Sequence, residues 1–186
     1  MQFLTTLLLA TSAMALPLVT LSSRTDSESC IAKGSEVTEW TIHDFDFHAS
    51  FTKDSSKKQK AAGSVSFTLE NPALSYKAKC HAKSDHADNF FYGNTDYDCD
   101  VPVKGEAASF TYHRKSGKLA ITQSWSCRKE GGRFEAKGET KVKLDCNKSS
   151  WKHSDYKTDE KVTSQRKLTC EKKTFKAPIT EISSVL

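Results

Sequence analysis

Apolar and polar residues alternate with a period of two along most of the 186-residue chain. The alternating runs cover residues 64–69, 74–80, 97–101, 108–112, 119–127, 142–146 and 168–170. Turn residues separate neighbouring runs, as at Lys115-Ser116-Gly117 and at Gly131-Gly132. Such alternation is typical of antiparallel strands that bury one face and expose the other. The pattern therefore predicts an all-β protein, a single-domain antiparallel β-barrel or sandwich of about eight or nine strands.

The alternation changes phase within the first predicted strand, residues 38–51. Apolar residues occupy even positions at Trp40 and Ile42, but odd positions from Phe45 onward. A strand changes phase in this way when one extra residue is inserted, so we expect a β-bulge near His43-Asp44.

Asp44, Asp46 and His48 follow at every second position and are expected to share the solvent face of this strand. Two carboxylates and an imidazole on one face are compatible with a metal site or with acid–base chemistry. They are also the ordinary composition of an exposed strand face, which is the interpretation that we favour. A recognition surface is then predicted at Asp44, Asp46, His48, Lys57, Lys58 and Lys60.

The N-terminus has the features of a secretory signal peptide. An apolar stretch at residues 3–10 precedes Ala13-Met14-Ala15, a small-x-small cleavage site. The apolar stretch is too short to span a membrane, and no second one follows. We expect a signal peptide at 1–15, a flexible leader at 16–29 and a secreted, extracellular domain at 30–170. Cleavage near Ala15 would leave about 170 residues, the size of a single domain.

An even number of cysteines in a secreted chain predicts a disulfide framework. The six are Cys30, Cys80, Cys99, Cys127, Cys146 and Cys170. One pairing joins Cys80 to Cys99 and Cys127 to Cys146, leaving Cys30 to Cys170. A rival pairing joins Cys30 to Cys146 and Cys127 to Cys170, and the sequence does not decide between them. Each local bridge should stabilise the folded state by roughly 3 kcal/mol, because it constrains the unfolded chain. This contribution matters because only 37% of the residues are hydrophobic, which indicates a modest core.

Several segments resemble a family of small secreted fungal proteins typified by the major Alternaria allergen and related plant-defence elicitors. The resemblance covers roughly residues 30–170. The segments are EWTIHDFDFHASF, VSFTLENPALSYKAKCHA, NFFYGNTDYDCDVP, SFTYHRKSGKLAITQSWSC and KVKLDC, together with the cysteine placement. The resemblance implies a disulfide-stapled β-barrel or sandwich without a catalytic centre, acting as an extracellular effector, an elicitor or a carrier of small phenolic ligands.

Two departures from the family pattern bear on these expectations. The allergen type forms a disulfide-linked dimer through an unpaired N-terminal cysteine, whereas the even count here lets Cys30 pair within its own chain. We therefore expect a monomer. The segment 171–186 lies beyond the resemblance and is predicted to be a poorly ordered polar tail.

Two further motifs have specific chemical interpretations. The loop 81–88 carries His81, Asp85, His86 and Asp88, which could bind a transition metal. Loops of this composition are more often solvated turns, so neither a metal nor another cofactor is expected. Asn147-Lys148-Ser149 is an N-glycosylation sequon, and Asn147 is the predicted acceptor.

Charge and motif content restrict the function classes. The formal net charge is +5, with lysines concentrated at 53–60 and 166–173, and around Trp151. A basic patch can bind polyanions such as pectic polymers or acidic membranes, but lysines on loops and strand edges also keep an all-β protein soluble and unpaired, which is the interpretation that we favour. An exported chain without a nucleic-acid module is not expected to bind nucleic acid. The chain lacks GxSxG, HExxH and phosphate-loop motifs, and its cysteines are assigned to bridges. We therefore expect that it is not an enzyme.

Two functions of different class remain. The first is a secreted protein that binds a host extracellular protein or a cell-wall component and modulates plant defence. The second is a carrier that holds a small aromatic, flavonoid-like ligand in an apolar pocket lined by Phe90, Phe91, Tyr92 and Trp125.

Overall fold

The computed structural model describes residues 29–54, 59–85, 90–152 and 162–185. The predicted signal peptide, the leader up to residue 28, and Lys57 and Lys58 lie outside these ranges. Within them, no helix is both long enough and apolar enough to cross a membrane.

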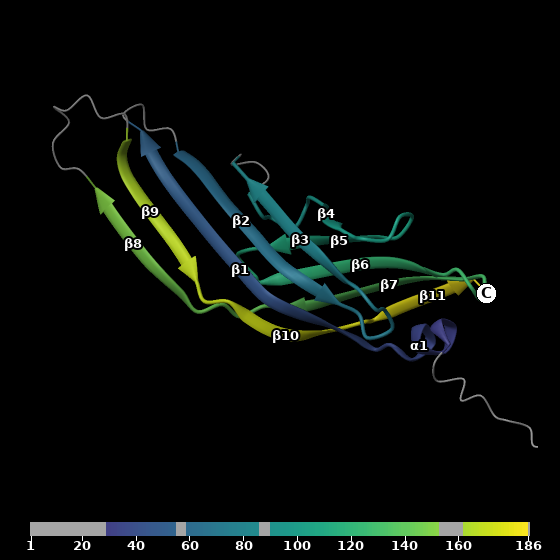
Figure 1. The fold of residues 1–186 in the computed structure, drawn as a ribbon. Coiled ribbons are helices and arrows are strands. Elements are labelled where there is room, and N and C mark those ends of the chain that lie inside the picture. The colour runs from purple at the N-terminus through teal and green to yellow at the C-terminus, as the bar shows by residue number, and fades with distance from the viewer. Residues whose placement is uncertain (1–28, 55–58, 86–89, 153–161, 186) are drawn as a thin grey trace, which may run out of the picture.

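The described residues form one short helix and eleven strands (Figure 1). The elements are α1 (Cys30–Glu36), β1 (Glu39–Asp54), β2 (Gln59–Glu70), β3 (Lys77–Ser84), β4 (Tyr97–Asp100), β5 (Ala107–His113), β6 (Lys118–Cys127), β7 (Gly132–Lys141), β8 (Cys146–Lys152), β9 (Val162–Cys170), β10 (Lys173–Pro178) and β11 (Glu181–Val185). The prediction of an all-β fold is confirmed, with more strands than expected and one helix that the pattern did not predict.

All strand pairs are antiparallel, and the strands form a sandwich-like arrangement of two sheets. The first sheet has the order β3-β2-β1-β9-β8, and the second has the order β5-β6-β7-β11. β4 pairs with β3 on one side and β5 on the other, and so joins the two sheets. On the opposite side β10 pairs with β1 and β11 pairs with β7, so the chain itself crosses between the sheets there. The strand ladder is therefore open, and the fold is a sandwich rather than a closed barrel.

The predicted alternation corresponds to the buried face of each strand. β3 and β6 alternate between buried and less buried residues along their whole lengths. Between the sheets the core is largely aromatic: Phe67 lies 4.9 Å from Phe110 and 5.6 Å from Phe45, measured between ring centroids. Edge-to-face and offset ring pairs at this spacing stabilise a core beyond their area alone.

The expected β-bulge is present in β1. The pairing register shifts between Ile42 and Phe45 against β10, and between His43 and Asp46 against β2. Asp44 has a φ of 53°, a left-handed conformation that aspartate tolerates better than most residues. Its backbone N–H donates to the Thr174 hydroxyl at 3.2 Å. The bulge lets Trp40 and Phe45 face the same core despite their opposite parity.

The prediction of a disordered C-terminal tail is wrong, because residues 173–178 and 181–185 form β10 and β11. Ala177 lies opposite Trp40, and Phe175 lies opposite Ile42. Ala177 is fully buried, and the Phe175 ring centroid lies 5.9 Å from that of Phe45. Each strand is only five or six residues long, too short for alternation to be distinguished from a tail.

The link between β10 and β11 approaches the second sheet closely at Gly138. A Cβ atom at this position would lie 2.1 Å from the Pro178 carbonyl oxygen and 2.9 Å from the Trp40 ring. The carbonyl belongs to backbone and the ring is fully buried, so neither can move without cost. We expect Gly138→Ala to lower the free energy of unfolding by roughly 2–3 kcal/mol in a urea titration. Glu139→Ala, at the exposed neighbouring position, is the control, and an equal loss in both variants would contradict this account.

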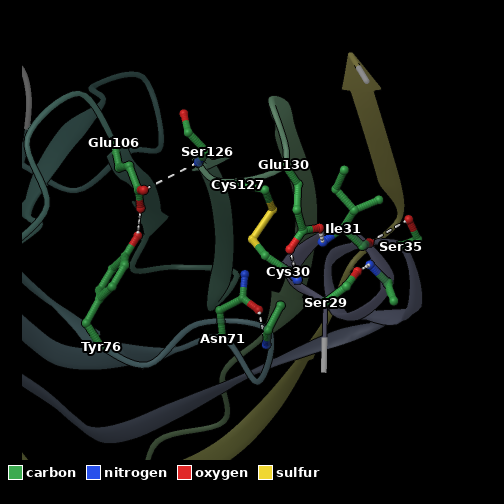
Figure 2. Close-up of a disulfide and its surroundings, with 12 residues drawn as sticks. Ser29, Cys30, Ile31, Ser35, Asn71, Tyr76, Glu106, Ser126, Cys127 and Glu130 are labelled. Carbon is green, nitrogen blue, oxygen red and sulfur yellow. Dashed lines mark hydrogen bonds between the residues drawn. A yellow bond between two sulfur atoms is a disulfide. The ribbon is translucent and has the colours of Figure 1, made fainter. Parts of the chain in front are cut away.

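A buried hydrogen-bond network links the two sheets. The Gln123 side-chain oxygen accepts from Trp40 Nε1 at 2.8 Å and from Asn71 Nδ2 at 3.0 Å. The Asn71 side-chain oxygen in turn accepts from the Ala73 backbone N–H at 2.9 Å, which holds the turn after β2 (Figure 2). Gln123 and Asn71 are both almost fully buried. The asparagine of the LENPA segment is therefore a core residue that fixes a turn.

The three disulfides are Cys30–Cys127, Cys80–Cys99 and Cys146–Cys170. The predicted Cys80–Cys99 bridge is confirmed, while both predicted pairings of the other four cysteines are wrong. Cys146 lies opposite Cys170 in the β8–β9 ladder, so these two sulfurs meet across neighbouring strands. Cys30 does pair within its own chain, as expected, but with Cys127 at the end of β6.

The Cys30–Cys127 bridge attaches α1 to the second sheet, and side chains complete the attachment (Figure 2). The Ser29 hydroxyl accepts from the Ala32 N–H and caps the helix. The Glu130 carboxylate accepts from the N–H groups of Cys30 and Ile31 at 2.9 and 3.0 Å. These backbone donors, Ile31 first, hold the pKa of Glu130 below its usual value.

Candidate functional site

The predicted recognition residues lie on the outer face of the first sheet. Past the bulge, the even-numbered residues of β1 point away from the core, as those of β2 do. The register places Asp46 opposite Ser66, His48 opposite Ser64, Ser50 opposite Ala62 and Thr52 opposite Lys60. The structure thus brings Asp46, His48 and Lys60 onto one face. Asp44 is exposed on the bulge itself.

Asp46 and His48 form a pair on this face. His48 Nε2 lies 2.8 Å from Asp46 Oδ1, with the Asp46 side chain 15% exposed. The contact is an ion pair when the imidazole is protonated. The described residues contain no group of three or more ligands arranged to hold a metal ion. The contact places the His48 imidazole beside the Asp46 carboxylate at the surface of the sheet.

A shallow groove of about 540 Å³ adjoins this pair. We call it the outer groove. It is lined by His48, Ala49, Ser50, Ala62, Gly63, Ser64, Lys83, Ser84, Asp85, Lys167, Leu168 and Thr169. Ser50 on β1 and Ala62 and Ser64 on β2 form its floor, and their small side chains leave a depression beside His48. Lys83 on β3 and Lys167 on β9 stand on opposite sides of the floor. Three strand spacings separate β3 from β9, which puts the two lysines about 14 Å apart across the strands.

Positive charge predominates around the outer groove. Lys83, Lys167 and Lys60 carry it, whereas Asp85 is the one carboxylate in the lining and Asp46 is engaged with His48. Further along the same face Glu70 contacts His43 and pairs with Lys77 at 2.8 Å. Lys77 and then His43 hold the pKa of Glu70 below its usual value. The negative charge of Glu70 is therefore balanced by Lys77, so it does not offset the positive charge of the groove lysines.

The residues of the predicted ligand pocket are not brought together. Phe90 and Phe91 are buried in the core, and Tyr92 is 43% exposed. Trp125 is fully buried and stacks on Phe134, with ring centroids 5.2 Å apart. Phe91 packs near Tyr112, and Tyr112 lies opposite Leu119 at the start of β6. Trp125 comes six residues after Leu119, which is about 20 Å along the strand and therefore far from Phe91. A carrier of a small aromatic ligand would need a different pocket.

The remaining predicted sites are placed only in part. Asn147 is exposed on β8, directly after the Cys146–Cys170 bridge, where a glycan has access to solvent. In the loop proposed as a metal alternative, His81 and Asp85 are described, while His86 and Asp88 lie outside the described residues.

Sequence reasoning missed the groove itself. It selected the charged residues of β1 but overlooked Ser50, Ala62 and Ser64, whose small size creates the depression. Their outward phase was readable from the alternation, but the pairing that sets Ser50 beside Ala62 depends on the register after the bulge. Lys83 and Lys167 lie far apart in the sequence, and only the strand order brings them to the two sides of one groove.

Comparison with known proteins places the chain in a family. The family model described as Alternaria alternata allergen 1 matches residues 42–176, which is well over half of the chain. The matched range begins in β1 and ends in β10, and it includes the bulge and the outer groove. A comparison with curated proteins finds no match, and a comparison with solved structures finds none either. On the strength of the family model, the chain belongs to the Alternaria alternata allergen 1 family.

Proposed function

We propose that this protein is a secreted, non-enzymatic binding protein that engages acidic polysaccharide of the plant cell wall through the outer groove and thereby modulates plant defence. The observation that carries the proposal is the pair of lysines, Lys83 and Lys167, on opposite sides of a floor of small residues that includes the hydroxyl groups of Ser50 and Ser64. A polyuronate chain laid across the strands would meet a cation at each side and hydroxyl groups between them.

The shape and chemistry of the groove favour a polysaccharide over a host protein as the first partner. Protein interfaces usually centre on buried aromatic or aliphatic anchors. Among the described residues, the exposed large hydrophobic side chains are Tyr92, Trp151, Ile182 and Val185, and none of them lines the groove. The groove offers charge and hydrogen bonds instead, which match a carboxylate-bearing sugar chain.

The non-enzymatic part of the proposal is supported by the pairing of the acidic residues. Hydrolysis of a sugar chain would use two carboxyl groups facing one another across the substrate. Here the Asp46 carboxylate faces the His48 imidazole, and Asp44 is displaced onto the bulge. This arrangement suits the binding of a sugar chain and not its hydrolysis.

Charge removal at the two groove lysines tests the proposal. We expect Lys83→Gln/Lys167→Gln to weaken binding to polygalacturonate by roughly tenfold, because each exposed charge contact contributes about 0.5–1 kcal/mol. Isothermal titration calorimetry at low salt measures the effect. The wild-type affinity should also fall as the salt concentration is raised, because salt screens exposed charges. At 0.1 M the screening length is about 10 Å.

The control removes the same charge elsewhere. Lys141→Gln/Lys143→Gln changes two exposed lysines outside the groove and should bind as the wild type does. Equal losses of affinity in the two double variants would mean that binding depends only on the net charge of the protein. That result would contradict binding in the outer groove. Infiltrated into leaf tissue, the groove variant should give a weaker oxidative burst than the control. If the groove variant no longer binds polygalacturonate but still gives the full oxidative burst, the response would depend on binding to a host protein instead.

A further inference from the structure

Three cations converge on the inner face of the first sheet, at the end where β8 and β9 extend beyond the second sheet (Figure 1). In the β1–β9 ladder Arg166 lies opposite Phe51, and Leu168 lies opposite Ala49. Leu168 also lies opposite Lys148 in the β8–β9 ladder. Opposite residues share a face, so Arg166 and Lys148 project toward the same side as the core residues Phe51 and Ala49. The third cation, Arg114, follows β5 of the second sheet.

The two guanidinium groups are held in place by aromatic rings. Arg166 lies 4.5 Å from the centroid of Phe51, and Arg114 lies 5.4 Å from the same ring. Arg114 also lies 5.0 Å from Phe90 and 5.3 Å from Tyr92. Its Nε donates to the Phe90 carbonyl at 3.2 Å. Two positive groups are therefore positioned beside a single ring, where they repel each other.

No carboxylate offsets this repulsion within the part of the chain that the structure describes. Some cations elsewhere in that part do have acidic partners, as in Lys118–Glu139 at 2.6 Å and Lys137–Glu135 at 2.9 Å. Arg114, Arg166 and Lys148 have no such partner there. Among the described residues, therefore, no acidic side chain balances the positive charge of this cluster.

The cluster surrounds a cavity of about 170 Å³. Its other lining residues are Phe47, Phe51 and Leu168, all apolar. The geometry points to a binding site for a small organic carboxylate, whose apolar body contacts Phe51 and Leu168 while its carboxylate is held by Arg114, Arg166 and Lys148. Guanidinium groups suit this role because their planar fork donates two parallel hydrogen bonds to a carboxylate.

This site is independent of the outer groove. It lies on the opposite face of the first sheet and shares with the groove lining only Leu168. Phe51 and Phe47 lie close to the earlier predicted pocket residues Phe90 and Phe91, but the ligand is selected here by its charge.

Benzoate titration at pH 7, where the ligand is ionised, tests the site. A ligand with so few atoms should bind with a dissociation constant on the order of 1 mM. Benzyl alcohol, which is neutral and of similar shape, and inorganic sulfate, which lacks an apolar body, are titrated in parallel. The binding is followed through the Nε–Hε resonances of the arginines and by saturation transfer to the ligand.

The variants are Arg166→Gln, Arg166→Lys and, as control, Arg133→Gln, an exposed arginine on β7. We expect at least about a tenfold loss of benzoate affinity in Arg166→Gln, a smaller loss in Arg166→Lys, and none in Arg133→Gln. Both Arg166 variants retain an exposed polar strand residue, so their unfolding midpoints should stay close to the wild type.

Four results would overturn the proposal. The first two are an absence of benzoate binding at tens of millimolar, and binding that is unchanged in Arg166→Gln. The third is equal binding of benzyl alcohol, which would remove the role of the charge. The fourth is sulfate binding as tight as that of benzoate, which would remove the role of the apolar wall.

Discussion

Replacing both Cys30 and Cys127 by serine is expected to lower the free energy of unfolding by about 4.5 kcal/mol. The bridge closes a loop of 97 residues, so breaking it releases much conformational entropy in the unfolded chain. The Cys80–Cys99 bridge closes a loop of only 19 residues, and its loss should cost about 3 kcal/mol. Chemical denaturation of the two double-serine variants measures the difference directly.

The folded state adds a second reason for the larger effect. Helix α1 has seven residues, too few to be stable in isolation, and it is held on the second sheet by this bridge and by Glu130. Gly34 of the helix lies against the Phe134 ring, which stacks on Trp125. Once the bridge is lost, we expect α1 to detach and Phe134 to become solvent-accessible. A smaller loss for Cys30→Ser/Cys127→Ser than for Cys80→Ser/Cys99→Ser would contradict both reasons.

Gln123→Leu is the second substitution with a large expected effect, a loss of roughly 2–5 kcal/mol in the free energy of unfolding. Leucine has a similar volume but no acceptor, so Trp40 Nε1 and Asn71 Nδ2 would both lose their bond to Oε1. Each unsatisfied buried donor costs about 1–3 kcal/mol. The change also releases Asn71, which holds the turn after β2 through the Ala73 N–H.

The matched control makes the same chemical change on a less buried strand. Gln165 on β9 is only partly buried and lies opposite Thr52, so Gln165→Leu should change the unfolding free energy by less than about 0.5 kcal/mol. Urea titrations of both variants provide the comparison. If Gln123→Leu unfolds at the same urea concentration as the wild type, the network does not stabilise the sandwich.

The features of the fold that depend on local alternation were predictable from the sequence. The strands around Phe67, Phe110 and Ile121 and the bulge at Asp44 follow from the phase of apolar residues, which each strand carries by itself. Gln123 was overlooked because it is polar, although its phase matches that of Ile121 and Trp125. A polar residue in the buried phase of a strand indicates a hydrogen-bonded core position.

The features that depend on which strands meet were not predictable. Cys146 and Cys170 pair because β8 and β9 are neighbours, and no local pattern specifies that order. The two proposed binding sites also depend on which strands are neighbours. Lys83 and Lys167 reach the outer groove from β3 and β9, and Arg114 and Arg166 reach the inner cavity from different sheets.

The most direct test of the central claim is to map where a short oligomer of galacturonic acid binds, from amide chemical shifts of the labelled protein. The account predicts that the largest shifts fall at His48, Ser50, Ala62, Ser64 and Lys83, on the outer face of the first sheet. Shifts that cluster on β5–β7, or that spread evenly over exposed lysines, would contradict the assignment of the outer groove as the binding site.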